Sequence, residues 1–161
     1  MDSIERQRKL FRKYAKTFSF AASFLGRKTF NKVVILYEFC RLVDDTADKE
    51  GNSEDAKEKL LSIKNDISKK QSEDPYISKF IDFLITQRLD QKYVLDLLDG
   101  VISDCQNRVS IKNEEHLLNY CYQVAGTVGA LMCPLLGVKE LQQDAALPAA
   151  MNLGIAMQLT N

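Results

Sequence analysis

Apolar side chains recur at helical spacing along almost the whole chain, and strand-like alternation is hard to find. Glycine and proline, which interrupt helices, number only 7 and 3 among 161 residues. Asp74 before Pro75 has the form of an N-cap with proline in the first turn, Gly137 that of a helix end, and Pro148 that of a kink. The pattern therefore predicts an all-α fold. We expect seven helices, over about residues 3–24, 29–48, 53–70, 75–88, 90–108, 113–136 and 140–161.

The charge balance limits the classes of partner. Lysine and arginine together number 22, and so do aspartate and glutamate, which removes any whole-chain case for nucleic-acid binding or strong attraction to anionic membranes. The four cysteines form no CxxC pair and the chain has one histidine, so we expect reduced, non-catalytic thiols rather than a zinc site. The charged N-terminus lacks a signal-peptide core, and no apolar run approaches the roughly 20 residues that span a bilayer. We expect a cytoplasmic protein and leave peripheral membrane association open.

Nothing in the sequence suggests a repeat, a low-complexity segment or a domain boundary, so residues 1–161 are expected to belong to one domain. The last stretch, "AAMNLGIAMQLTN", stays helical and apolar to its final residue without a C-cap or polar tail. We therefore expect these residues to be a piece of a longer protein.

An acidic cluster follows an apolar helical run in "YEFCRLVDDTAD", residues 37–48. On a helix Asp44 and Asp48 share a face, roughly 6 Å apart, and their charges repel by about 1–3 kcal/mol. A divalent cation would remove that repulsion, and Mg²⁺ is usually held by one or two carboxylates with waters and phosphates. Arg41, one turn earlier, could contact the same phosphates. A solvated helix end with an Arg41–Asp45 ion pair explains the spacing as well.

Two later stretches also leave alternatives open. In "YCYQVAGTVGALMCPLLG" (120–137), small residues in the middle of a helix indicate either tight helix packing or a groove for a long apolar ligand, with the Tyr120 hydroxyl near a polar head group. The groove would be lined by Val124, Ala125, Val128, Gly129 and Met132. In "LGIAMQLTN" (153–161), Gly154, Gln158 and Asn161 recur at helical spacing, which suits a core hydrogen-bond pair or a ligand.

Taken together, these segments resemble the squalene/phytoene synthase family, the head-to-head prenyl transferases. The resemblance rests on "KTFSFAASFL" (16–25), "YEFCRLVDDTAD", "LLDGVISDCQNR" (97–108), "YCYQVAGTVG" and "LGIAMQLTN", in order and with similar spacing. It implies an isoprenoid synthase-type helical bundle, of which residues 1–161 form the N-terminal portion, truncated before the second aspartate-rich motif. It also implies Mg²⁺-dependent joining of two prenyl diphosphates through a cyclopropyl diphosphate, with release of diphosphate.

The resemblance assigns roles residue by residue. Asp44 and Asp48 would bind Mg²⁺, Arg41 would bind diphosphate, and Tyr37 and Tyr120 would contact the head group or cation region. The N-terminal substrate segment would be Lys16, Thr17, Phe18 and Ser19. The tail tunnel would be lined by Val124, Ala125, Val128, Gly129 and Gly154, with Gln158 and Asn161 beside the second diphosphate. Tyr14 stands where some members have histidine, a departure from the family pattern.

The favoured member is a phytoene synthase acting on geranylgeranyl diphosphate. A squalene or dehydrosqualene synthase acting on farnesyl diphosphate is the alternative, and a non-catalytic helical assembly or binding relative of the fold is a third hypothesis. Because half of the metal cluster would lie beyond Asn161, we expect the fragment alone to be inactive.

Overall fold

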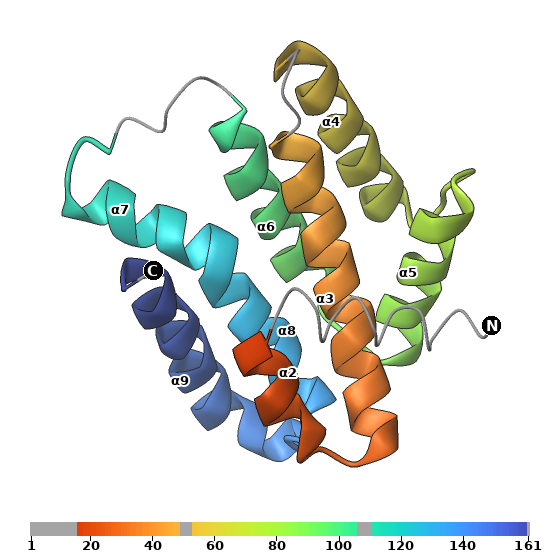
Figure 1. Cartoon of the computed structure of the whole chain (residues 1–161), viewed down its shortest axis with the longest axis vertical. Helices are drawn as coiled ribbons and strands as arrows, with labels where there is room; N and C mark the ends of the chain where they lie inside the picture. Colours follow the sequence, from red (N-terminus) through yellow and green to blue (C-terminus); the bar gives the residue numbers. More distant parts are fainter. Residues whose placement is uncertain (1–15, 49–52, 106–110, 161) are drawn as a thin grey trace. The chain divides into compact units, whose positions relative to one another are not determined.

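The computed structural model describes residues 16–48, 53–105 and 111–160, and within these ranges every regular element is helical (Figure 1). The predicted all-α fold is therefore confirmed. Residues 3–15 of the first expected helix lie outside the described residues. The elements are α2 Lys16–Ser23, α3 Arg27–Ala47, α4 Ser53–Lys69, α5 Pro75–Thr86, α6 Gln91–Asp104, α7 Glu114–Cys121, the π-helical segment η1 Tyr122–Gly126, α8 Thr127–Leu135 and α9 Glu140–Leu159.

The chain divides into two compact units, Met1–Leu42 and Val43–Asn161, and the division falls within α3. The first unit holds α2 and most of α3, and α3 begins at Arg27, two residues before the expected start at about residue 29. The second unit holds the end of α3 and every later helix. The expectation of one domain for residues 1–161 stays a prediction.

Side-chain caps fix where three helices of the second unit begin. The carboxylate of Asp74 accepts hydrogen bonds from the backbone N–H groups of Tyr76, at 2.7 Å, and Ile77, at 3.2 Å, and Pro75 follows as the first helical residue. This confirms the N-cap predicted from Asp74 and Pro75. Asp90 caps α6 and Asn113 caps α7 in the same way. Such caps satisfy N–H groups that have no partner within the helix.

Three helices are followed by a residue in the left-handed conformation, of which one was predicted from the sequence and two were not. Gly137 has φ +91 and follows the last turn of α8, as predicted for a helix end. Lys70 and Arg88 adopt the same left-handed conformation after α4 and α5, with φ 56 and φ 53. The chain reverses at Arg88 through bonds from the Leu89 N–H to the Leu84 carbonyl and from the Arg88 N–H to the Ile85 carbonyl. A side chain in this conformation is strained, which the sequence did not indicate.

The sixth expected helix is continuous in space but changes its hydrogen-bond pattern midway, at η1. A π-helical turn carries one more residue than an α-turn and widens the helix locally. The widened turn lies against Gly100 of α6, where an added Cβ would be 2.8 Å from the Cβ of Gln123. Gly100 therefore makes room for η1.

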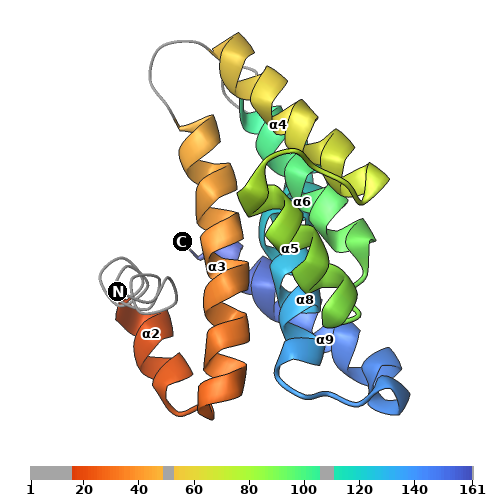
Figure 2. The same ribbon diagram turned by 90° about the vertical axis from the view of Figure 1, so that its right-hand side faces the viewer.

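The core of the second unit is built on α6. In Figure 2, α4, α5 and α6 lie side by side, and α4 contacts both of the others. The opposite side of α6 packs on η1 and α8, which in turn pack on α9. Buried side chains recur every three or four residues along these helices, as an amphipathic pattern requires. They include Leu60, Ile63 and Ile67 of α4, Ile77, Phe80 and Leu84 of α5, Val94, Leu98 and Val101 of α6, and Leu131 and Leu135 of α8.

Leu60, Ile63 and Ile67 of α4 are buried, but Leu61 is 46% exposed, because the position after Leu60 on a helix turns away from α6. The four cysteines are thiols rather than halves of a disulfide, and Cys105, Cys121 and Cys133 are buried. None of the helices in the described part of the chain combines the length and the apolar character that a membrane span requires.

Candidate functional site

The acidic cluster lies at the C-terminal end of α3. Asp44 and Asp45 occupy its last turn, and Asp48 follows directly, with its N–H bonded to the carbonyl of Asp44 at 2.9 Å. All three side chains are exposed. The C-terminal end of a helix carries partial negative charge, so carboxylates there are electrostatically unfavourable, and no basic residue occupies this last turn. An exposed pair of carboxylates in such a place suits a bound cation.

A second pair of polar residues joins α6 to α7. Tyr120 is partly buried, and its hydroxyl donates a hydrogen bond to Oδ2 of Asp104, the last residue of α6, at 3.1 Å. The other carboxylate oxygen of Asp104, Oδ1, is buried, and no described residue bonds to it. The segment "LLDGVISDCQNR" was recognised from the sequence, but Asp104 was not singled out within it.

The charges of the acidic cluster contribute to the raised pKa values of Asp104 and Tyr120. Burial raises the pKa of Asp104, the hydrogen bond from Tyr120 lowers it, and the charge of Asp48 raises it again. Burial and then the charge of Asp104 raise the pKa of Tyr120 to about 12, with a smaller contribution from the charge of Asp44. Asp44, Asp48, Asp104 and Tyr120 all belong to the second unit. They therefore share one electrostatic environment.

The donor set fits a hard cation only in part. Carboxylate oxygens are the ligands that Mg²⁺ prefers, and Asp44 and Asp48 offer two, which is a usual protein contribution to a Mg²⁺–phosphate site. Within the described residues, no group of three or more acidic, histidine or cysteine side chains is arranged to hold a metal. A complete site would need further oxygen ligands, such as substrate phosphates and waters.

The remaining predicted head-group residues lie in the first unit. Arg41 is exposed and Tyr37 partly buried, both on α3, where Tyr37, Arg41 and Asp45 follow at intervals of four residues along one helix. The N-terminal substrate segment forms the first turn of α2. These predicted residues are Lys16, Thr17, Phe18 and Ser19. Asn161 lies outside the described residues.

The predicted tunnel residues lie where η1 and α8 meet α9. A Cβ added to Gly129 would come within 2.2 Å of the Ala150 carbonyl oxygen, and one added to Gly154 within 2.4 Å of the Ala125 carbonyl oxygen. The glycines thus allow close contact between helices, one of the two alternatives left open by the sequence. Val124, Ala125 and Val128 are partly exposed beside this contact, and Gln158 is partly exposed near the end of α9. Their role as tunnel lining stays a prediction.

A different polar cluster was not predicted at all. The Tyr122 hydroxyl donates to Oδ2 of Asp96 at 2.7 Å, and the ammonium of Lys92 contacts both the Tyr122 hydroxyl, at 3.1 Å, and the Asp96 carboxylate. These bonds raise the pKa of Lys92. Tyr122 and Tyr120 both bond to carboxylates of α6, but Asp96 and Asp104 are eight residues apart, so the two clusters lie about two turns from each other along that helix. We interpret the cluster of Lys92, Asp96 and Tyr122 as a structural contact that holds η1 against α6.

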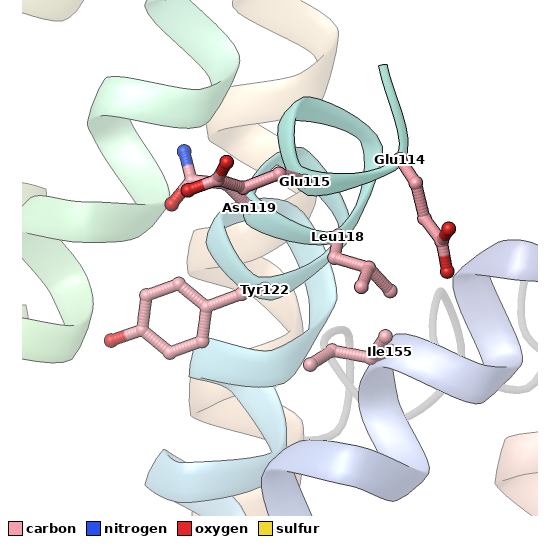
Figure 3. A pocket seen from close by; sticks show the side chains of 6 residues that line it. All are labelled: Glu114, Glu115, Leu118, Asn119, Tyr122 and Ile155. Carbon is pink, nitrogen blue, oxygen red and sulfur yellow. The ribbon is translucent and has the colours of Figure 1, made fainter.

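An open groove borders the same cluster, between α7, η1 and α9 (Figure 3). Leu118 and Ile155 point toward each other across it, and the ring of Tyr122 points away from them. The other lining residues are Glu114, Glu115 and Asn119. None of the predicted site residues lines this groove.

The sequence matches a protein-family model and is similar to several known proteins. The family model described as squalene/phytoene synthase matches residues 11–161. The chain is 30% identical over 159 residues to a phytoene synthase of Pseudescherichia vulneris, covering 91% of this chain and 50% of that protein. It is 31% identical over 160 residues to a 4,4'-diapophytoene synthase of Staphylococcus haemolyticus, covering 94% and 54%.

Solved structures give the same result for the fold. A ligand-bound dehydrosqualene synthase superposes with a TM-score of 0.79 at 26% identity, covering 98% of this chain and 54% of the other. A squalene synthase of Alicyclobacillus acidocaldarius superposes with a TM-score of 0.77 at 23% identity, covering 96% and 58%. The chain thus spans about half the length of the relatives it matches.

Proposed function

Because this chain belongs to the squalene/phytoene synthase family, we propose that the natural polypeptide containing it joins two prenyl diphosphates head to head and releases diphosphate. The observation that carries the proposal is the match of residues 11–161 to the family model. The acidic end of α3, the glycine contacts of α8 with α9 and Tyr120 all fall within that match.

The chain's own residues would act as follows. Asp44 and Asp48 would hold Mg²⁺, which when bound would neutralise diphosphate charge and assist its departure. Arg41 is exposed one turn earlier on the same helix, and its planar guanidinium suits a bidentate contact with a phosphate. Tyr37 and Tyr120 would face the head group or the cation region.

We favour geranylgeranyl diphosphate as substrate and phytoene as product, in keeping with the phytoene synthase at 30% identity. Farnesyl diphosphate is a specific second candidate, because the 4,4'-diapophytoene synthase is 31% identical and the dehydrosqualene synthase superposes closely. The apolar depth available to the tail would decide between them. Val128, Gly129 and Gly154 would form part of that wall.

The test is to incubate the complete natural polypeptide with radiolabelled farnesyl and geranylgeranyl diphosphate, with and without Mg²⁺, and to separate the apolar products by chain length. We expect a hydrocarbon of twice the substrate's length, formed only with the metal. Formation of no such product from either substrate would refute the proposal and favour a non-catalytic relative of the fold.

Two variants test the assignment of the metal ligands. Asp48→Asn removes one proposed ligand with almost no change in size, and we expect it to lower turnover by at least about 100-fold, as loss of a metal-binding charge does. Asp45→Asn alters a neighbouring exposed carboxylate of the same helix end and is the matched control. Equal activity of the two variants would contradict the assignment.

Location and partners belong to the same proposal. We propose a cytoplasmic protein that contacts membranes peripherally, because its substrates would carry lipid-like tails. Co-sedimentation of the complete polypeptide with phospholipid vesicles, with and without prenyl diphosphate, measures this directly; recovery in the supernatant under both conditions would contradict it.

A further inference from the structure

Asp104 stands where a carboxylate is unfavourable on several independent grounds. It is the last residue of α6, at the negative end of the helix dipole. It is partly buried, and its Oδ1 is buried without a partner among the described residues. Each of these features disfavours a negative charge. Asparagine has almost the same shape, could accept the same hydrogen bond, and would avoid the charge.

Tyr120 is the group that Asp104 contacts. A phenol hydroxyl has one proton to donate, and Tyr120 donates it to Oδ2 of Asp104 at 3.1 Å. While this bond is in place, the phenol oxygen can only accept hydrogen bonds or face positive charge. It cannot donate to a diphosphate oxygen. The hydrogen bond therefore favours the cation region over donation to the head group, the two roles that were open for Tyr120.

We propose that Asp104 is a positioning residue that fixes the Tyr120 hydroxyl so that its oxygen lone pairs, rather than its proton, face the substrate. The inference rests on the proposed function, since it needs a substrate that develops positive charge when its diphosphate departs. A negatively charged acceptor makes the phenol oxygen more electron-rich than a neutral one does. In this arrangement Tyr120 stabilises the developing allylic cation. Asp104 acts only through Tyr120 and does not contact the substrate.

The test measures kcat, KM and the melting temperature of four variants of the complete natural polypeptide. Asp104→Ala removes the acceptor, Asp104→Asn keeps an acceptor without the charge, and Tyr120→Phe removes the hydroxyl. Asp99→Asn is the matched control, because Asp99 lies on the same helix and pairs with Lys64. We expect Asp104→Ala to lower kcat on the order of 10-fold to 100-fold, as misplacement of a catalytic group does, with KM changed by less than about 3-fold.

Two further results separate positioning from a purely structural role. Asp104→Asn should recover part of the lost kcat while melting no lower than the wild type. The double variant Asp104→Ala/Tyr120→Phe should have the kcat of Tyr120→Phe alone, because residues that act as one unit are not additive. Fully additive losses, a rise in KM at unchanged kcat, or wild-type kcat in Asp104→Ala would each overturn the proposal.

The same experiment distinguishes an error in the proposed function from an error in the role of Asp104. If the wild-type polypeptide converts neither prenyl diphosphate, the family reaction is refuted, and the role of Asp104 with it. If the wild type and Asp99→Asn convert substrate and Asp104→Ala does so equally well, only the role of Asp104 is refuted.

Discussion

The substitution Gly129→Ala should destabilise the protein by disrupting the close packing of α8 against α9. The new Cβ would lie 2.2 Å from the Ala150 carbonyl oxygen and 2.8 Å from the Ala150 carbonyl carbon, both backbone atoms that cannot rotate away. Overpacking of this kind costs about 1–3 kcal/mol, and the rigid neighbours place the cost at the upper end or above it. Alanine returns up to about 1 kcal/mol through its higher helix propensity. The net loss is about 2 kcal/mol, which lowers the melting temperature by roughly 4–8 °C in a chain of this size.

The measurement is thermal and urea unfolding followed by far-ultraviolet circular dichroism, with Gly126→Ala as the matched control. Gly126 lies three residues earlier, and an added Cβ there meets the side chains of Tyr122, at 3.1 Å, and Ile155, at 3.3 Å, which can shift by a few tenths of an ångström. We expect Gly126→Ala to change stability by less than about 1 kcal/mol. If Gly129→Ala proved as stable as Gly126→Ala, the close approach of α8 to α9 would not be what requires glycine.

Arg88→Gly should raise the free energy of unfolding by about 1 kcal/mol, because residue 88 has φ 53 and glycine adopts that conformation without strain; Arg88→Ala, which keeps the Cβ, should show no such gain in urea unfolding. Asp104→Asn should raise the melting temperature at pH 7. The pKa of Asp104 is raised above its ordinary value of 3.8, so ionisation destabilises the fold as pH rises through that window. The gain should shrink toward zero as the pH falls to about 4, and an unchanged gain at low pH would refute the electrostatic explanation. Residues 1–161 alone should turn over neither prenyl diphosphate even with Mg²⁺, whereas product formation would show that the segment suffices for catalysis.

Much of the helical order follows from short-range rules. Asp74, Asp90 and Asn113 cap helices through bonds that reach two or three residues along the chain, and such local geometry can be read from sequence. Gly137 ends its helix for an equally local reason. The left-handed conformations of Lys70 and Arg88 have no such signal. Neither residue type favours that conformation, and the buried neighbour Leu89 indicates that packing beyond Arg88 draws the chain back.

In the candidate site, too, only the contacts between residues that are close in sequence could be predicted. Asp44 and Asp48 are four residues apart, so helix periodicity alone brings them to one face. Asp104 and Tyr120 are 16 residues apart and belong to two different helices, and no periodicity relates them. Gly129 and Gly154 were recognisable from the sequence as small residues within helices, but their partners Ala150 and Ala125 were not.

The sequence by itself determined the helical class, most helix limits, the acidic face of α3 and the family, because these depend on residue types and spacings along one element. Only the tertiary structure decided the widened turn of η1 against Gly100, the direct contact of α8 with α9, and the hydrogen bond that engages the proton of Tyr120. Each of these depends on how closely two helices approach. That distance is set by packing of whole faces, which no local pattern specifies.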